Sequence, residues 1–370
     1  MRLPAFRKRA VEVDVAVLGS GVPALAGALE LSGRGSRVAV LGPPGAGERP
    51  RGLGLALLGP GRAYARVARA IGRSPARLVW AAGCENHLRL RALVDESRRD
   101  CGYAARGSFL LACRRAEAEE LAESEDLLRD DGFPGEFLDH YMLETRFDLS
   151  GFPGAYWAAE DAEVDVGRLL VLLRERAQDS GVSFPAGPVR GIAADASGVS
   201  LDTPAGRVRA ASALVATDGA VSDLVPELRP LLRPAARDRL RARLLSGAVL
   251  PTAVRTADGR IAWQGGEGAV LLCRIGVAAD EAAGSLEAVA MRLPVETAPA
   301  SRWEEDGEVS VDGLPVVGRL PDRPLAVACG FGALSAGFAF AAARWAADAL
   351  LSGADPTPAP LRATRRPAFV

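Results

Sequence analysis

A glycine-rich turn near the N-terminus constrains the fold of this 370-residue chain more than any other feature. Residues 13–18, VDVAVL, form the short β-branched run expected of a buried parallel strand. Residues 19–24 then match the pattern G-x-G-x-x-A, and helical spacing continues to Leu31. A second strand is predicted over residues 37–41. Strand, glycine turn, helix and strand within about 30 residues predict a dinucleotide-binding unit of the Rossmann type.

Each position of the turn has a physical role in such a unit. Gly19 permits the tight turn, Gly21 lets the backbone approach a pyrophosphate, and Ala24 allows close packing of helix on strand. Val22 and Pro23 open the helix, where a proline is tolerated because its missing N–H would be unpaired. The positive end of the helix dipole favours the negative phosphates.

The second strand departs from the usual pattern at its end. An Asp or Glu normally follows there and holds the ribose hydroxyls, but this chain has Gly42. Glu48, in the stretch GAGER, is the candidate replacement.

The last 60 residues carry a second pattern. Residues 310–318 read SVDGLPVVG, a strand is predicted over 325–329, and Gly330-Phe331-Gly332-Ala333 opens a long apolar helix. A chain that binds only NAD through its first half does not need this return.

Together the two ends resemble the D-amino-acid oxidase, glycine oxidase and sarcosine oxidase family of FAD-dependent oxidoreductases. That family shows a tryptophan, then T/S-x-D-G-x-P-x-[IV]-G, a strand and a G-F-rich turn, and Trp303 and Ser310 stand at the family's spacing. The resemblance implies bound FAD, with the N-terminus of the last helix at the flavin's pyrimidine edge. It assigns Gly330, Phe331, Gly332 and Ala333 to that edge.

The resemblance also organises the middle of the chain. Residues 163–169 resemble the segment that re-enters the FAD-binding domain, and residues 213–222 resemble the family's A-x-G-A-x-S turn, which assigns Thr217 and Gly219 to the cofactor. The implied fold is α/β, α+β overall, with a Rossmann-like FAD-binding domain and a discontinuous antiparallel-sheet substrate domain. The predicted FAD-binding domain comprises 10–85, 155–235 and 305–355, the substrate domain 86–154 and 236–304, and the C-terminal tail 356–370.

The reaction implied by the resemblance is oxidation of a C–N bond in an amine or amino acid, with hydride transfer to flavin N5. An amino-acid substrate needs a cation for its carboxylate, ideally an arginine fork. Glycine-oxidase-like members place that arginine four residues after the tryptophan, where this chain has Gly307. Glu308 and Val309 leave no cysteine for covalent flavin attachment, and Lys8 lies too far upstream to activate oxygen near N5.

Other arginines are therefore candidates for the carboxylate. We select Arg274 as the catalytic-site cation and Trp263 as a wall of the pocket, with Tyr103 as a further aromatic. The remaining candidate cations are Arg255, Arg292 and Arg302. His87 and His140 are interpreted as surface or packing residues rather than general bases.

Composition excludes several other classes of protein. The 45 basic and 46 acidic residues give a net charge of -1, so no bulk field favours nucleic acid or an anionic membrane. Five cysteines without CxxC spacing predict neither a metal site nor disulfides, and no signal segment or 18-residue apolar run occurs. We predict a cytoplasmic enzyme with a small-molecule substrate.

Two further functions remain open from the sequence. Gly42, Gly307 and the lack of a suitable lysine are typical of a degenerate flavin-binding subunit that works in a larger complex with a partner subunit. The Asp218-Gly219 pair is instead typical of an aromatic-hydroxylase-type flavin monooxygenase reduced by NAD(P)H.

Overall fold

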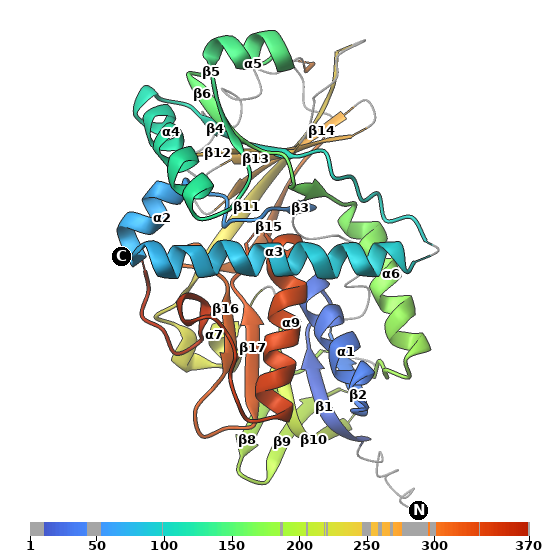
Figure 1. Cartoon of the computed structure of the whole chain (residues 1–370). Coiled ribbons are helices and arrows are strands. Elements are labelled where there is room, and N and C mark those ends of the chain that lie inside the picture. The colour runs from blue at the N-terminus through green and yellow to red at the C-terminus, as the bar shows by residue number, and fades with distance from the viewer. Residues whose placement is uncertain are drawn as a thin grey trace, which may run out of the picture.

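The computed structural model describes residues 11–42, 53–97, 99–185, 188–204, 206–217, 219, 221–245, 253–257, 261–266, 269–275, 295–296, 301–332 and 334–368. Two large sheets dominate it, one in each half of the molecule (Figure 1). A two-stranded sheet lies between them.

The first large sheet has seven strands and a parallel centre. Its path runs β16-β17-β10-β1-β2, with β1, β2, β10 and β17 parallel, and β9 and β8 extend it from β10 as antiparallel strands. All four residues of β2 and all five of β17 are buried, as expected where helices cover a parallel sheet. The strands are β1 (Val11–Leu18), β2 (Val38–Leu41), β8 (Gly191–Asp195), β9 (Gly198–Thr203), β10 (Gly206–Val215), β16 (Val316–Arg319) and β17 (Leu325–Cys329).

Helices α1 (Val22–Gly33) and α9 (Ser335–Leu351) lie side by side against this sheet, and α6 (Val166–Asp179) packs beside α1 (Figure 1). Helix α9 is almost wholly apolar, with thirteen buried residues, because it also packs under α3 (Arg73–Asp95), which crosses it.

The crossing is fixed by Asn86 of α3. Its amide donates to the carbonyl of Ala336 at 2.8 Å and accepts from the N–H of Phe340 at 2.8 Å. Those two groups are partners in an uninterrupted α-helix, so the side chain joins α3 to the first turns of α9.

The second large sheet has eight strands drawn from three distant parts of the chain. Its order is β15-β11-β14-β13-β12-β4-β6-β5, antiparallel except where β12 pairs with β4. The strands are β4 (Ser108–Ala112), β5 (Glu136–Asp139), β6 (Gly154–Ala158), β11 (Leu232–Arg243), β12 (Ala253–Thr256), β13 (Ile261–Gly266), β14 (Ala269–Ile275) and β15 (Ser301–Ser310).

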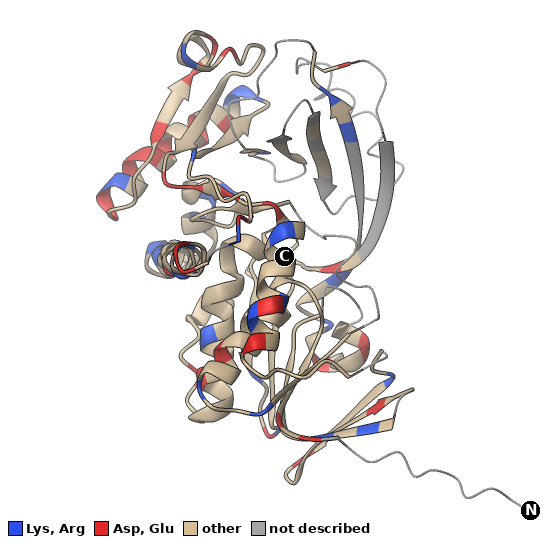
Figure 2. Cartoon of the chain, turned by 90° about the vertical axis from the view of Figure 1, so that its right-hand side faces the viewer, with Lys and Arg blue, Asp and Glu red and all other residues tan. Residues whose placement is uncertain are grey.

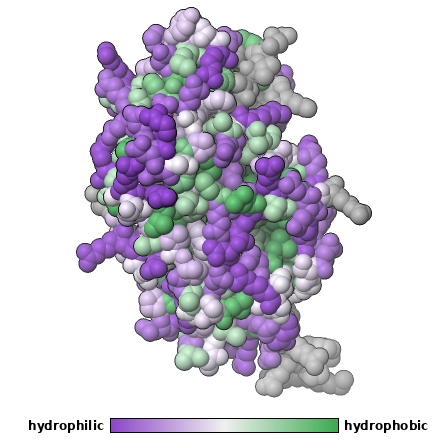
Figure 3. All heavy atoms as spheres, viewed as in Figure 1, coloured by the Kyte–Doolittle hydropathy of each residue, from purple (hydrophilic) through white to green (hydrophobic). Residues whose placement is uncertain are grey.

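Shorter elements connect the two halves. Strands β3 (Leu55–Ala56) and β7 (Ala162–Glu163) form the small sheet. Acidic residues, drawn red in Figure 2, are frequent along α4. The face that Figure 3 shows is mostly hydrophilic, with small apolar areas between. The remaining helices are α2 (Tyr64–Ile71), α4 (Arg115–Asp130), α5 (His140–Phe147), α7 (Val221–Leu224) and the 3-10 turns η1 (Pro226–Leu228) and η3 (Ala359–Leu361).

These elements confirm the predicted fold class, an α/β protein with a Rossmann-like unit and a large, mainly antiparallel second sheet. The predicted strand 325–329 coincides with β17. The domain boundaries stay a prediction. Within the described ranges, no helix combines the length and apolar character needed to cross a membrane.

Candidate cofactor site and adjoining cavity

The carboxyl ends of four parallel strands meet at one edge of the seven-stranded sheet. Leu18 of β1 pairs in register with Leu41 of β2 and Val215 of β10, and Val215 pairs with Val327 of β17. The residues that follow these strand ends therefore share one edge, and they include Gly19, Gly42, Thr217 and Gly330. Ligands of open α/β sheets bind outside the carboxyl ends of the strands.

Gly19 is held in a conformation and a space that only glycine fits. Its φ is +131°, and its N–H donates to the carbonyl of Leu41 at 2.8 Å. A Cβ at this position would overlap the carbonyl oxygen of Ala216. Gly21 then caps α1, with Pro23 in the first turn, as the sequence predicted. The first N–H groups of α1 therefore face the shared edge.

Gly27 was not identified from the sequence, yet it sets how close α1 lies to the sheet. A Cβ there would overlap the Leu214 side chain of β10. The role expected of Ala24, close helix-to-strand packing, is therefore shared with a residue three positions later.

The glycine turn packs closely on Gly42, where the sequence lacks the usual strand-end acid. A Cβ at Gly42 would lie 3.1 Å from Cβ of Ser20 and 3.3 Å from the carbonyl oxygen of Gly19. A side chain here would therefore require the turn to shift by a few tenths of an ångström. Glu48, the proposed replacement, lies outside the described residues.

Thr217 and Gly219 follow β10 at the same edge. The Thr217 hydroxyl oxygen is buried and has no hydrogen-bond partner among the described residues. The N–H groups of Val221 and Ser222, by contrast, both donate to the buried Glu308 carboxylate, at 2.6 and 3.2 Å. Of this turn, the Thr217 hydroxyl rather than the start of α7 is thus available to a ligand.

Gly330 and Phe331 form the other end of the edge. The N–H of Ser310 donates to the carbonyl of Gly330 at 3.3 Å, and Phe331 bridges to Val309. The Ser310 hydroxyl is buried and, within the described part of the chain, unpartnered. Gly332 follows, and Ala333 lies outside the described residues. This turn leads directly into α9.

A cavity of about 50 Å³ lies beneath the eight-stranded sheet. Leu57 and Arg62 are among its lining residues, and both also lie close to segments that flank the Gly330 turn. A Cβ at Gly337, in the first turn of α9, would lie 3.1 Å from the Leu57 carbonyl oxygen, and one at Gly313 would lie 3.2 Å from Nε of Arg62. Leu57 therefore lies between the cavity and the start of α9.

Three charged side chains line the cavity. Arg62 and Arg255 contribute guanidinium groups, and Asp161 contributes a carboxyl. Asp161 accepts the N–H of Leu58 at 2.8 Å and the hydroxyl of Ser108 at 2.6 Å. Burial raises the pKa of Asp161 to about 7, although both hydrogen bonds lower it. The described lining thus combines two guanidinium groups with one carboxyl that titrates near neutral pH.

Apolar and aromatic side chains form the rest of the cavity wall. They come from α2, α3, α4 and the sheet face that carries Arg255. Such a wall suits the hydrophobic part of a small molecule. Its large members are Tyr64, Trp80, Leu121, Leu128, Phe133 and Tyr156.

Of the two sequence-selected catalytic residues, only Trp263 has a described side chain that can be placed relative to this cavity. Gln264 hydrogen-bonds to Gly54 at 3.2 Å and Val164 at 3.3 Å, so its face of β13 looks toward the seven-stranded half. Trp263 alternates with it and is fully buried on the opposite face, against Val254 and Leu272. Trp263 therefore does not line this cavity, and its assignment as a wall of the substrate pocket stays a prediction.

The candidate cations separate in a similar way. Arg255 is 7% exposed and lines the cavity. Arg274 lies in β14, paired with Ile261, and its side chain is outside the description, as are the side chains of Arg292 and Arg302. Arg62 and Asp161 were missed, because nothing local in the sequence distinguishes them from surface charges.

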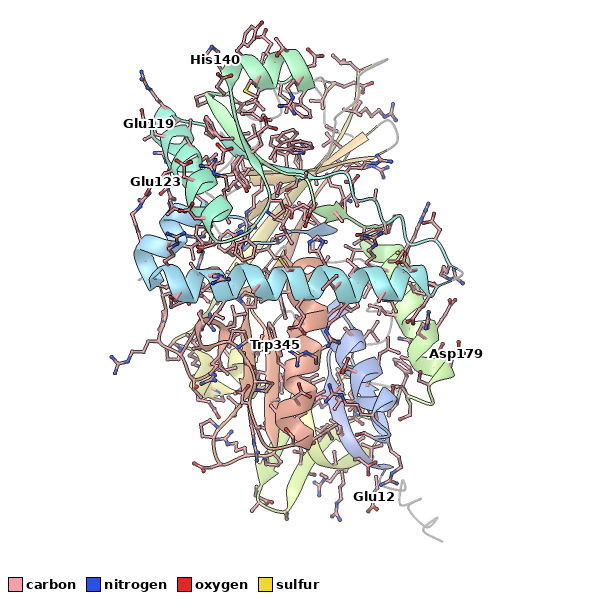
Figure 4. The ribbon with its side chains drawn as sticks, viewed as in Figure 1. Glu12, Glu119, Glu123, His140, Asp179 and Trp345 are labelled. Carbon is pink, nitrogen blue, oxygen red and sulfur yellow. The ribbon has the colours of Figure 1, made fainter. Side chains whose placement is uncertain are left out.

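The two histidines differ in their surroundings. Burial lowers the pKa of His87 to about 4, although a hydrogen bond to the backbone of Ala56 raises it. His140 is exposed at the start of α5, at the outer end of the eight-stranded sheet (Figure 4). Among the described residues, no group of three or more His, Cys, Asp or Glu side chains is placed to hold a metal ion.

The family is established by the sequence signature described as "FAD dependent oxidoreductase", DAO, which matches residues 14–349. The chain belongs to this family, and FAD is its cofactor. The residues present fit that group, since glycines clear the carboxyl edge and two buried hydroxyls there lack protein partners among the described residues. No curated protein matches the sequence.

Solved structures share the fold over nearly the whole chain. Glycine oxidase from Geobacillus kaustophilus has a TM-score of 0.77 at 22% identity, with 96% of this chain and 99% of that chain covered. L-proline dehydrogenase from P. horikoshii has a TM-score of 0.77 at 14% identity, with 95% and 96% covered. L-amino acid deaminase from Proteus vulgaris has a TM-score of 0.76 at 16% identity, with 98% and 99% covered.

Proposed function

We propose that this FAD-dependent oxidoreductase oxidises the C–N bond of a small amine that carries a carboxylate, an amino acid or a close analogue. The main support is the cavity lined by the guanidinium groups of Arg62 and Arg255, whose lining residue Leu57 also lies against the first turn of α9. The names of the structural neighbours, which include glycine oxidase and L-amino acid deaminase, agree with this substrate class.

The chain's own residues have distinct tasks in this proposal. The N-terminus of α1 and the Thr217 hydroxyl hold the phosphate and ribose end of the cofactor, and Gly330–Gly332 hold the ring end. Arg255 holds the substrate carboxylate, in place of the arginine that glycine-oxidase-like members carry at the position of Gly307. When bound, FAD supplies the electron acceptor for the oxidation.

Arg255 is favoured over the other arginines by its position. It lies on the sheet face that looks toward the cofactor half, and Gly61 provides the room for its side chain, since a Cβ there would lie 2.5 Å from Cδ of Arg255. A guanidinium walled by apolar side chains interacts with a carboxylate more strongly than an exposed one.

The test is anaerobic titration of the purified flavoprotein with a panel of amino acids and of the matching amines without a carboxylate. We expect amino acids to bleach the flavin absorbance. In Arg255→Gln the substrate concentration for half-maximal bleaching should rise about a hundredfold for amino acids and little for plain amines. Arg106→Gln, an exposed cation outside the cavity, is the matched control.

Two results would contradict the proposal. Equal bleaching by amines and amino acids in the wild type would remove the role of the carboxylate site. An amino-acid response unchanged in Arg255→Gln would remove the role of Arg255.

The second candidate is a flavin-binding subunit without turnover of its own. Its support is the pair of glycines, Gly42 and Gly307, at positions where relatives are expected to carry functional side chains. Bound flavin that no amine, amino acid or NADPH reduces would favour it. Rapid reduction by NADPH alone would instead favour the monooxygenase alternative.

A further inference from the structure

The C-terminal segment carries a buried arginine that holds the turn between β15 and β16. Arg365 donates to the carboxylate of Asp312 through Nε at 3.1 Å and Nη2 at 2.9 Å. The Arg365 side chain is 6% exposed and that of Asp312 is 0% exposed. A bidentate ion pair of this kind fixes both the distance and the plane of its partners.

Arg365 also binds the backbone of the same turn. It donates to the carbonyl of Leu314 at 2.8 Å and to that of Pro315 at 3.1 Å. Asp312 in turn accepts the N–H of Leu314 and that of Ala368, each at 3.1 Å. Hydrogen bonds to the Asp312 carboxylate and to the carbonyls of Leu314 and Pro315 thus join the turn to the C-terminal segment.

The turn that Arg365 holds lies beside the Gly330 turn, which is predicted to hold the ring end of the cofactor. Ser310, two residues before Asp312, donates its N–H to the carbonyl of Gly330. Gly313, the next residue after Asp312, packs against the guanidinium of Arg62, which lines the cavity. A displacement of the turn would therefore move Gly330 on one side and Arg62 on the other.

The C-terminal segment has other attachments, so Arg365 is not its only link to the fold. The N–H of Ala363 donates to the carbonyl of Val317 at 2.7 Å, and Arg362 bridges Val317 in parallel. Asp355 accepts the N–H of Arg319 at 3.1 Å. These contacts are along β16 and not at the Asp312 turn, so they can keep the segment in place when Arg365 is changed.

We propose that Arg365 is a positioning residue for the ring end of the FAD site. It acts through Asp312, whose turn carries Ser310 and Gly313 against Gly330 and Arg62. Residues 356–370, predicted as a tail from the sequence, would then be a functional part of the cofactor site. The proposal rests on FAD binding and not on the identity of the substrate.

The test compares two arginine variants that each lose buried or half-buried ion pairs. Arg365→Gln loses the contact with Asp312. Arg344 lies in the second half of α9, and Arg344→Gln loses the contacts with Glu85 and Asp348. The apoproteins are titrated with FAD, with quenching of flavin fluorescence as the readout, and the unfolding temperature of each apoprotein is measured in parallel.

We expect Arg365→Gln to raise the Kd for FAD at least about tenfold and to shift the reduction potential of bound flavin. Arg344→Gln should leave the Kd within about threefold of the wild type. Arg365→Lys keeps the charge without the fork, so its Kd should lie between those of the wild type and the Gln variant.

Equal Kd values for the Arg365 and Arg344 variants would overturn the proposal. Should Arg365→Gln fail to fold, the titration uses the double variant Asp312→Asn with Arg365→Gln, which leaves no buried charge alone. Wild-type affinity for FAD in the double variant would reduce Arg365 to a purely structural residue. Failure of both the double variant and Arg365→Lys to fold would lead to the same conclusion. Loss of substrate-dependent bleaching in the wild type would affect only the proposed function.

Discussion

The two large sheets of this protein build their functional edges in different ways. At the seven-stranded sheet, each candidate cofactor residue lies within a few residues of the end of its strand, so a strand and the next few residues specify one corner of the predicted cofactor site. At the eight-stranded sheet, the cavity brings Arg62, Asp161 and Arg255 together from three separate stretches. A local sequence motif therefore predicts the cofactor edge. The cavity, by contrast, becomes apparent only when distant segments of the chain have packed together.

The largest expected effect tests the local site. Gly19→Val should abolish FAD retention and lower the free energy of unfolding by about 3 kcal/mol or more, because the side chain meets the Ala216 carbonyl at a strained φ. Flavin content and urea denaturation measure the two effects. Gly33→Ala has open space around its new Cβ and is the control. A yellow, stable Gly19→Val protein would contradict the prediction.

The next variant separates the two regions. Gly61→Ala places a Cβ 2.5 Å from Cδ of Arg255 at a positive φ, which should cost about 1 to 3 kcal/mol and displace that side chain. Flavin content should stay at the wild-type level while amino-acid-dependent bleaching falls about tenfold or more. Loss of both together would show that the two regions are not independent.

The pH dependence of stability tests His87 of α3, which is hydrogen-bonded to the backbone of Ala56 in the small sheet between the two large ones. Unfolded His87 titrates near 6.5, while burial lowers the pKa in the folded state to about 4. Between these values only the unfolded chain binds the proton, so the stability falls as the pH falls through this window. At pH 5 the loss is about 2 kcal/mol relative to pH 7.

His87→Gln should remove that part of the pH dependence, measured as the free energy of unfolding at pH 7 and pH 5. The matched control is His140→Gln, since these are the two histidines of the chain and His140 is exposed. An unchanged slope in His87→Gln would show that this histidine does not titrate as described.

The smallest effect concerns the ion pairs that join α1, α3 and α9. Burial acts to raise the pKa of Glu85, but hydrogen bonds from Arg344 and Arg89 hold it below its ordinary value of 4.5. This carboxylate contributes stability above that value and loses the contribution as the pH falls through its lowered pKa. Glu85→Gln should cost about 1 kcal/mol at pH 7 in low salt and less in high salt.

The exposed pair of Arg115 and Glu119 supplies the control for Glu85. Its side chains are 91% and 68% exposed, so Glu119→Gln should change stability by no more than a few tenths of a kcal/mol. A salt-independent loss in Glu85→Gln would point to packing rather than charge as its contribution. Urea denaturation at two salt concentrations distinguishes these outcomes.

The sequence predicted much of the first region and little of the second. The first strand, the Gly19 turn, the strand 325–329 and the Gly330 turn could be predicted because their signals are local, in glycines and in short apolar runs. The sequence could not decide between Arg255 and Arg274 as the substrate cation, because strand register determines which residues of a strand face the cofactor half. Gln264 and Trp263 illustrate this, since neighbouring residues of β13 lie on opposite faces.

The amino-acid sequence alone predicted that both ends of this chain build one FAD site, because the glycine turn and the D-G-x-P pattern need no distant residue to be recognised. The tertiary structure alone decided that the glycine turn packs closely on Gly42, that Asp161 and Arg255 share a cavity, and that Arg365 reaches Asp312. Those facts depend on distances between segments far apart in the chain, and such distances are set only when the strands pair and the helices pack.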